Sequence, residues 1–337
     1  MFIVASTLLG STAWGWGAEG HRTVGALADK LLAGSAAAAQ VDTLLGGVKL
    51  QDAAVWADCA KGVDPSKDFK YISAGKFPEC QIFETPEGEA ELADYVRRND
   101  TNCARVAGDE SCHKQYHYTD VAIQRHGYKL GTAGTHEFDI VGAIAAATHV
   151  LAGDPSPAPF DITSKREALF LLAHFLGDIH QPLHVGAVYL APDGSVIDPD
   201  VGVFAPETSN RGGNDVVVFR RATTRRLGNL HQSWDDIPET LTPAHVDAAW
   251  VKLARATPRS SGSNVEWSKS WASETLTQAR AAVQGLDFRP QQNFGATNLQ
   301  WPLTLPYSYD PRMEPVKKRQ LTKAGARLAA LLKSIWP

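Results

Sequence analysis

The stretch AHFLGDIHQPLH, residues 173–184, constrains this chain more than any other part of its sequence. His174 and Asp178 lie four residues apart, so both side chains project from one face of a helix. The residues around them are largely apolar, which predicts a helix that is buried on nearly every side. A buried ionised carboxylate is costly unless it is paired, and a bound cation removes that cost. The stretch therefore predicts a metal site inside a helical core.

A second stretch repeats the spacing. In LHQSWD, His231 and Asp235 again lie four residues apart on an expected helix. Between the two pairs lies His184, which follows Pro182, where the first helix should end or bend. A single pair of this kind usually satisfies itself by a hydrogen bond, but two pairs and a further histidine favour metal ions. Imidazole and carboxylate together suit zinc.

Helical periodicity dominates the rest of the chain. Helices are predicted over residues 21–33, 42–45, 52–59, 89–98, 138–152, 164–179, 225–234, 243–255, 265–283 and 316–335. Thr135 is a candidate cap for the helix at 138, and Ser164 and Glu167 form a capping box. The clearest strand signal is 215–220, and 286–315 should be irregular. These patterns predict an all-α fold with small β-hairpin excursions.

Residues 16–337 are expected to form a single compact helical domain. At 337 residues and 44% hydrophobic composition, the chain can bury a core as one large domain or two moderate ones. No segment has the length or charge bias of a disordered linker, which favours one domain. The net charge of −4 excludes a strongly cationic surface, so a polyanionic partner would need a local site or bound metal.

The first fifteen residues resemble a secretory signal. An apolar run is followed by Ala13 and Gly15, which suit cleavage before Trp16, although no Lys or Arg precedes the run. An apolar N-terminal strand is the alternative, and cleavage before Trp14 is a competing position. No later run is long enough for a membrane span. We therefore expect residues 1–15 to be a signal peptide and the protein to be exported, either secreted or periplasmic.

Four cysteines lie between residues 59 and 112, an even number that suits two disulfides in an exported protein. Of the three connectivities, pairing Cys59 with Cys80 and Cys103 with Cys112 is favoured because each bond closes a short loop; reduced, buried thiols are the alternative. The sequence Asn-Asp-Thr beginning at Asn99 is a glycosylation motif if the host is eukaryotic.

Six separated motifs, taken together, resemble the zinc-dependent S1/P1 nucleases of the mung bean type. The motifs are WGAEGH at 16–21, WAD at 56–58, HYTD at 117–120, HFLGDIHQPLH at 174–184, GGND at 212–215 and LHQSWD at 230–235. They span nearly the whole chain after residue 15 in the order of the family, so the resemblance is specific although each motif alone is common. It implies an α-helical fold with three zinc ions at the base of a cleft.

The resemblance assigns ligands to each zinc ion. Asp58, His117, His174 and Asp178 would hold the first ion, His184, His231 and Asp235 the second, and His21, Asp178 and Trp16 the third. Trp16 would bind through its amino nitrogen and carbonyl oxygen. Because a peptide nitrogen is a poor ligand, the third site would be complete only after cleavage before Trp16.

The expected reaction is hydrolysis of single-stranded DNA and RNA to 5′-phosphate products, and of 3′-mononucleotides. Two zinc ions that share Asp178 can hold a bridging hydroxide for attack on phosphorus, while the third binds the leaving 3′ oxygen. Asp58, Asp178 and Lys61 are therefore the expected catalytic residues. The resemblance places Lys61 against the phosphate, where many members carry arginine.

The resemblance also implies three contacts with the rest of the substrate. Tyr118 would stack on an unstacked base and Asp120 would hydrogen-bond to it, which accounts for a preference for single strands. Asn214 would orient a loop near the metals. We expect a monomer without stable membrane association.

Two alternatives remain open at this stage. A zinc-dependent phospholipase C shares a similar site, but Asp235 stands where such lipases tend to carry Glu, and the segment HYTD favours a nuclease. A noncatalytic metal-binding or nucleic-acid-binding module should have lost at least one ligand, and none is missing.

Overall fold

The structure, a computed structural model, describes residues 16–104, 110–220, 226–295 and 298–337. The expected signal peptide lies outside the described residues. The α-helices are α1 Ala18–Leu32, α2 Ala36–Leu45, α3 Leu50–Ala53, α4 Trp56–Ala60, α5 Pro86–Arg98, α6 Cys112–Gln115, α7 Ile140–Ala152, α8 Lys165–Asp178, α9 Leu230–Asp235, α10 Ala248–Arg255, α11 Trp267–Val283 and α12 Tyr309–Ile335.

Short strands and 3-10 helices connect these helices. The strands are β1 Val63–Asp64, β2 Lys70–Tyr71, β3 Val121–Ala122, β4 Gly186–Ala187, β5 Val216–Arg220, β6 Arg226–Asn229 and β7 Trp301–Leu305. The 3-10 helices are η1 Pro65–Lys67, η2 Pro78–Phe83, η3 Pro182–His184, η4 Pro206–Thr208, η5 Arg211–Gly213, η6 Glu239–Leu241, η7 Pro243–His245 and η8 Asn264–Glu266. The mostly helical fold with small β elements confirms the predicted class.

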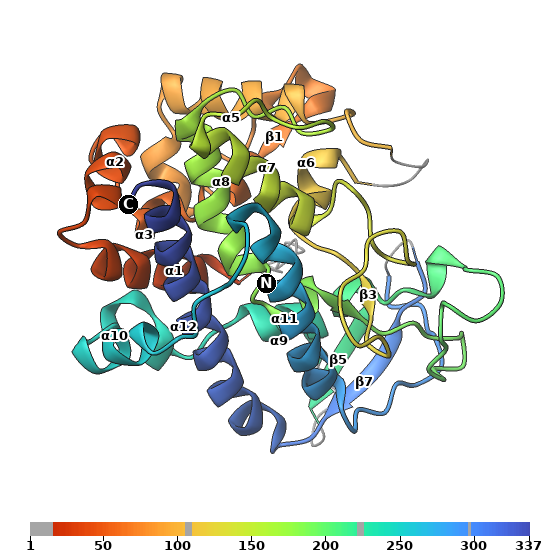
Figure 1. The fold of residues 1–337 in the computed structure, drawn as a ribbon. Coiled ribbons are helices and arrows are strands. Elements are labelled where there is room, and N and C mark those ends of the chain that lie inside the picture. Colours follow the sequence, from red (N-terminus) through yellow and green to blue (C-terminus); the bar gives the residue numbers. More distant parts are fainter. Residues whose placement is uncertain (1–15, 105–109, 221–225, 296–297) are drawn as a thin grey trace, which may run out of the picture.

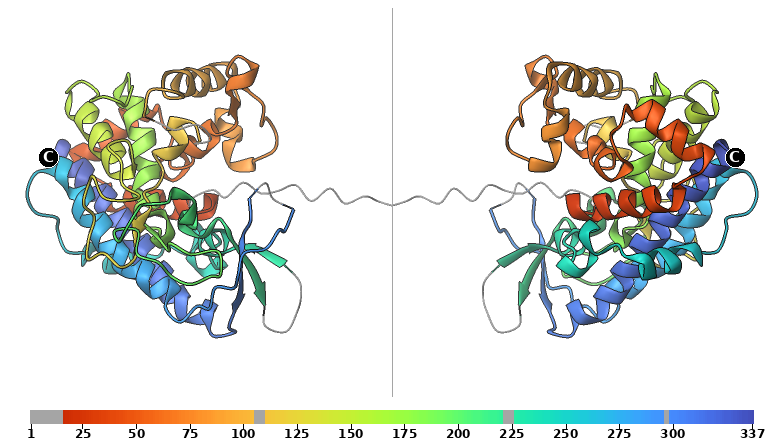
Figure 2. Two further views of the ribbon diagram at one scale, coloured as in Figure 1. Left: turned by 90° about the vertical axis from the view of Figure 1, so that its right-hand side faces the viewer. Right: turned by 90° about the vertical axis from the view of Figure 1, so that its left-hand side faces the viewer.

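Helix α8 forms the centre of the molecule, and α1, α7 and α12 pack against it (Figure 1). The three-stranded sheet, in the order β6-β5-β7, lies to one side of the helices (Figure 2). Within α8, every residue from Glu167 to Asp178 is buried, as its apolar sequence predicts. The Ser164 hydroxyl accepts a hydrogen bond from the Glu167 amide at 3.1 Å, which confirms the predicted cap.

Two segments differ from the sequence prediction. The helix predicted over 225–234 begins only at Leu230, because Arg226–Asn229 forms a strand that pairs antiparallel with β5. The segment 286–315 is not irregular throughout, since Trp301–Leu305 forms a strand parallel to β5. A lone short strand is unstable in water, so both of these strands depend on pairing with β5.

Two helix boundaries also differ. Asp139, not Thr135, caps α7, because its carboxylate accepts hydrogen bonds from the amides of Val141 and Gly142. Helix α12 begins at Tyr309 and continues through Pro315, whereas the prediction began it after the proline. None of the helices in the described ranges combines the length and apolarity of a membrane span.

Two disulfides hold the segment between α4 and α6. They join Cys59 to Cys80 and Cys103 to Cys112, which confirms the favoured pairing. The first bond begins in α4, one of the helices that position the site described below.

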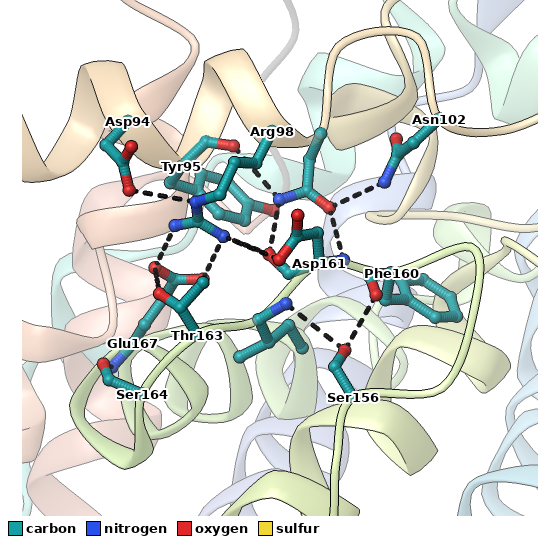
Figure 3. Close-up of polar contacts among 12 residues, drawn as sticks. Asp94, Tyr95, Arg98, Asn102, Ser156, Phe160, Asp161, Thr163, Ser164 and Glu167 are labelled. Atoms are coloured by element: carbon teal, nitrogen blue, oxygen red, sulfur yellow. Dashed lines mark hydrogen bonds and ion pairs between the residues drawn. The ribbon is translucent and has the colours of Figure 1, made fainter.

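A polar network joins the end of α5 to the start of α8 (Figure 3). The Arg98 guanidinium donates to Glu167 at 2.6 Å and to Asp94 at 2.9 Å. The buried Asn99 amide nitrogen donates to the Tyr95 carbonyl at 3.1 Å and to the Asp161 carbonyl at 2.9 Å. Because both of its N–H groups are used inside the fold, Asn99 cannot carry a glycan in the folded chain, whatever the host.

Candidate metal centre

Helices α1 and α8 pack against each other near the middle of the molecule (Figure 1). Buried histidine and aspartate side chains converge where the first turns of α1 meet the last turn of α8. Three groups have ligand atoms within 4.8 Å of one another: first Asp58, His117 and His174; second His184, His231 and Asp235; and third His21, His174 and Asp178. They come from α1, α4, the turn after α6, α8, η3 and α9. The structure thus brings together every histidine and aspartate that the sequence predicts as a ligand.

The first group surrounds one oxygen of Asp178. Its Oδ2 lies 2.9 Å from Nδ1 of His117 and 3.0 Å from Nε2 of His174. The Asp58 carboxylate lies 3.5 Å from the same His174 nitrogen. Because His174 and Asp178 are one turn apart on α8, the helix itself sets this part of the geometry.

The second group contains two imidazoles that face each other. His184 and His231 donate from Nδ1 to the carbonyls of His117 and Gly212, at 2.7 and 2.8 Å. Those bonds leave a lone pair on each Nε2, and the two Nε2 atoms are 3.0 Å apart. Gln181 donates to Oδ1 of Asp235 at 2.8 Å, so the other carboxylate oxygen remains available.

The third group lies beside the first. His21 stacks on His174 with ring centroids 3.8 Å apart, and its Nε2 lies 3.2 Å from Oδ1 of Asp178. Trp16 is buried before the first turn of α1, and the following amide, of Gly17, donates to the Asp235 carbonyl at 3.0 Å. The backbone near residue 16 is therefore tied to the helix that carries the second group.

Burial sets the protonation of these side chains. It lowers the pKa of His21 to about 4 and that of His231 to about 3, so both imidazoles are neutral near pH 7. Burial raises the pKa of Asp235 well above its ordinary value. For Asp178, burial opposes ionisation, but the neighbouring imidazoles of His174 and His184 lower its pKa well below the ordinary value.

This arrangement fits cations. Two nitrogen lone pairs 3.0 Å apart repel each other unless a positive charge lies between them. Ligands about 2.1 Å from a tetrahedral zinc ion are about 3.4 Å from each other, close to the spacing of His184 and His231. The donor set of imidazole and carboxylate also suits zinc.

The residues predicted to contact substrate lie around these groups. Lys61 donates to Oδ1 of Asp58 at 2.6 Å, so its ammonium already neutralises a candidate ligand. Tyr118 is partly exposed, and burial raises the pKa of Asp120 to about 6. The Asn214 amide donates to the Arg211 carbonyl at 3.0 Å within its own turn. The roles of these four side chains stay predictions.

Sequence reasoning missed three residues that support the site. Gln181 donates a hydrogen bond to Asp235, and the sequence feature that could have identified it is a polar amide side chain within the largely apolar stretch at 173–184. The carbonyl of Gly212 orients His231, and no sequence pattern shows which carbonyl an imidazole will find. Arg211 precedes that glycine and forms two hydrogen bonds with Asp215.

Comparison with known proteins gives the family of the chain. The S1/P1 nuclease family model matches residues 88–337. The chain belongs to the S1/P1 nuclease family. Nuclease S1 of Aspergillus oryzae (strain ATCC 42149 / RIB 40) is 25% identical over 98% of this chain and 95% of its own length. Endonuclease 2 of Arabidopsis thaliana is 25% identical over 96% of this chain and 91% of its own. Endonuclease 4 of the same plant is 28% identical over 50% of this chain and 50% of its own length.

Family membership confirms the resemblance and supports a nuclease function over a phospholipase C. The matched region contains six of the predicted ligands, His117, His174, Asp178, His184, His231 and Asp235. Trp16, His21 and Asp58 precede it. These three join the site through the contacts described above, and the two longer alignments include nearly the whole chain.

Proposed function

We propose that this S1/P1 nuclease uses three zinc ions to hydrolyse single-stranded DNA and RNA to 5′-phosphate products, and 3′-mononucleotides to nucleosides and inorganic phosphate. The observation that carries the proposal is the pair of unprotonated Nε2 atoms of His184 and His231, which lie 3.0 Å apart. Asp58, His117, His174 and Asp178 would hold one ion, His184, His231 and Asp235 a second, and Trp16, His21 and Asp178 a third.

Zinc would supply Lewis acidity, which lowers the pKa of water and stabilises negative charge on phosphate oxygens. The protein's own contribution is to hold the ligands in place. Backbone carbonyls fix the imidazoles of His174, His184 and His231 with Nε2 facing inward. Gln181 fixes the orientation of Asp235. These contacts remove the need to reorganise the ligands when an ion or a substrate binds.

Two groups would act on the substrate beside the ions. The Lys61 ammonium, 2.6 Å from Asp58, would also face a phosphate held at the first group and offset its charge. Tyr118 follows the ligand His117 directly, so a base stacked on its ring would place its phosphate near the metals. Asp120 would accept a hydrogen bond from the base. Stacking of this kind requires a base outside a duplex, which supports single-strand specificity.

We also infer that the protein is exported as a monomer and that residues 1–15 are removed. A free amine at Trp16 would give the third ion a good nitrogen ligand, whereas a peptide nitrogen would not. The burial of Trp16 and the bond from Gly17 to the Asp235 carbonyl support a fixed position for this amine beside the site.

The test uses protein that begins at Trp16 and a matched form with one extra alanine before it. Each form is assayed on single-stranded DNA, RNA, 3′-AMP and phosphatidylcholine, with and without a chelator, and zinc is measured by mass spectrometry. We expect chelator-sensitive hydrolysis of the three nucleotide substrates, three zinc ions in the first form and about two in the second. Release of phosphocholine alone, or chelator-resistant binding of DNA without turnover, would overturn the nuclease proposal. Equal zinc contents would refute the role of Trp16.

A further inference from the structure

A turn of three left-handed residues carries an arginine beside the candidate site. Arg211, Gly212 and Gly213 have φ angles of 49°, 58° and 89°. Glycine adopts this region freely, but an arginine there is strained. A Cβ at Gly212 would lie 2.1 Å from the Leu183 carbonyl oxygen, so the turn itself needs that glycine. Nothing in the backbone requires an arginine at position 211, which directs attention to its side chain.

The turn connects the predicted base-binding residues to the metal ligands. The Ser209 hydroxyl donates to Oδ2 of Asp120 at 3.3 Å and accepts from the Arg211 amide at 3.0 Å. The next carbonyl, of Gly212, accepts from His231. Arg211 therefore lies between the residue expected to contact the base and a residue expected to hold zinc.

The guanidinium of Arg211 is held in place from one side. Its Nε and Nη2 donate to the two oxygens of Asp215 at 2.7 and 2.8 Å. Asp215 is in turn anchored, because its carbonyl accepts from the Trp301 amide of β7 at 2.9 Å. Nη1 makes no hydrogen bond with any other residue in the described part of the chain, and the Arg211 side chain is 52% exposed. The Nη1 edge of the guanidinium, which is positively charged and held in place by Asp215, thus faces outward.

The substrate has an anionic group for this edge. In a strand whose base lies at Tyr118 and Asp120 and whose scissile phosphate lies at the metals, a neighbouring phosphodiester comes within reach of this turn, because Ser209 links Asp120 to the Arg211 amide. The chain has a net charge of −4, so it offers no general attraction for a polyanion. Asp215, Glu110 and Tyr118 raise the pKa of Arg211, so its guanidinium stays protonated, and Arg211 in turn acts on the Asp120 carboxyl. A phosphate here therefore meets a permanent cation with preset geometry.

We propose that Arg211 binds the phosphodiester group next to the scissile one, and so makes the enzyme prefer strands over mononucleotides. This inference rests on the proposed nuclease function. It adds a phosphate contact that 3′-AMP, which carries only the phosphate to be cleaved, cannot make.

The experiment compares Arg211→Gln with the wild type on 3′-AMP and on a tetraadenylate, at several NaCl concentrations. Loss of a charged phosphate contact should raise KM for the tetranucleotide about tenfold, and far less for 3′-AMP. The slope of log KM against log salt should fall by about 0.7, the value for one contact on a single strand. Arg211→Lys should restore the slope but not the full affinity, because lysine lacks the fork.

Two controls separate this contact from a structural role. Arg220→Gln removes another arginine that is 52% exposed and paired with an aspartate, Asp310, and it should leave KM and the salt slope as in the wild type. Asp215→Asn removes the carboxylate partner of Arg211 but leaves the positive charge of Arg211, so the salt dependence of KM should stay as in the wild type. An equal rise of KM for both substrates, or an unchanged slope in Arg211→Gln, would overturn the proposal. Fluorescence polarisation of a labelled tetranucleotide measures the salt dependence of binding without turnover. If the wild type is inactive, the nuclease proposal is refuted, but the binding slopes of the wild type and Arg211→Gln still test the phosphate contact.

Discussion

Single backbone hydrogen bonds decide which nitrogen of each buried imidazole is available to an ion. His174, His184 and His231 all donate from Nδ1 to a carbonyl, at 2.7 to 2.8 Å, and turn Nε2 toward the shared space. His21 differs, because neither of its ring nitrogens makes a well-aligned hydrogen bond with a described residue. Its position depends instead on stacking against His174 and on the absence of a side chain at Gly177.

Gly177→Ala should therefore displace His21. A Cβ at this position would lie 2.5 Å from Nδ1 of His21, and His174 blocks retreat on the opposite face. We expect the zinc content to fall by about one ion per chain, measured by mass spectrometry after dialysis against buffered zinc. Gly325→Ala is the matched control, since its Cβ would meet Leu27 at 2.5 Å between α1 and α12, away from the ligands. Full zinc content in Gly177→Ala would contradict this account of His21.

A buried histidine outside the site should make stability depend on pH. Burial lowers the pKa of His113 to about 3, and its ring nitrogens have no hydrogen-bond partner among the described residues. The unfolded imidazole has a pKa of about 6.5, so below that pH the unfolded chain binds a proton that the folded chain does not. The free energy of unfolding should fall as pH drops from 6.5 toward 3, by about 1.4 kcal/mol per pH unit from this residue.

His113→Leu should remove this part of the pH dependence. Urea denaturation of zinc-free protein at pH 6 and pH 5 measures it, and the variant should lose about 1.2 kcal/mol less than the wild type between the two. His126→Leu, at an exposed position, serves as the control. Parallel losses in the wild type and His113→Leu would show that His113 is not held neutral.

At the scale of elements, α9 depends on α12. A six-residue helix is not stable alone, yet α9 carries both His231 and Asp235. The buried ammonium of Lys317 donates to the carbonyls of Ser233 and Asp236, at 2.7 and 2.5 Å, where α9 ends. Burial lowers the pKa of Lys317 to about 8, so the lysine remains mostly charged at pH 7.

Lys317→Met should loosen α9. Methionine retains much of the apolar stem but leaves two carbonyls without a donor, which should cost about 1–3 kcal/mol in the free energy of unfolding. Denaturation measures this cost, and hydrogen exchange of amides 230–236 should report faster opening. Lys318→Met, at an exposed neighbour that lies over the Trp250 ring, should change both much less. Unchanged exchange in Lys317→Met would show that α12 does not hold α9.

At the scale of the whole molecule, the site is assembled from residues that are far apart in the sequence. Ligand candidates extend from Trp16 to Asp235, and α12, near the other end of the chain, braces the last of them. The Cys59–Cys80 disulfide holds the segment that carries Asp58. No single helix forms any one of the groups alone, so the site depends on the complete packing of the chain.

Local chemistry in the sequence predicted the parts of this protein that depend on neighbours in the chain. The apolar surroundings of His174 and Asp178 predicted the buried helix α8, Ser164 predicted its start, and short loops favoured the observed disulfides. These signals suffice because periodicity, capping and loop closure act over a few residues. The spacing of the two His–Asp pairs likewise predicted four of the side chains that converge, whereas His21, Asp58 and His117 were expected only from the resemblance to the family.

Tertiary contacts decided the remainder. The strands β6 and β7 exist because they pair with β5, and no local pattern identifies a partner that lies far along the chain. Likewise, no local pattern predicts that the Gly212 carbonyl orients His231 or that Asp215 holds the Arg211 guanidinium. A hydrogen bond depends on where its partner lies in space, and only the packed chain brings these groups within reach.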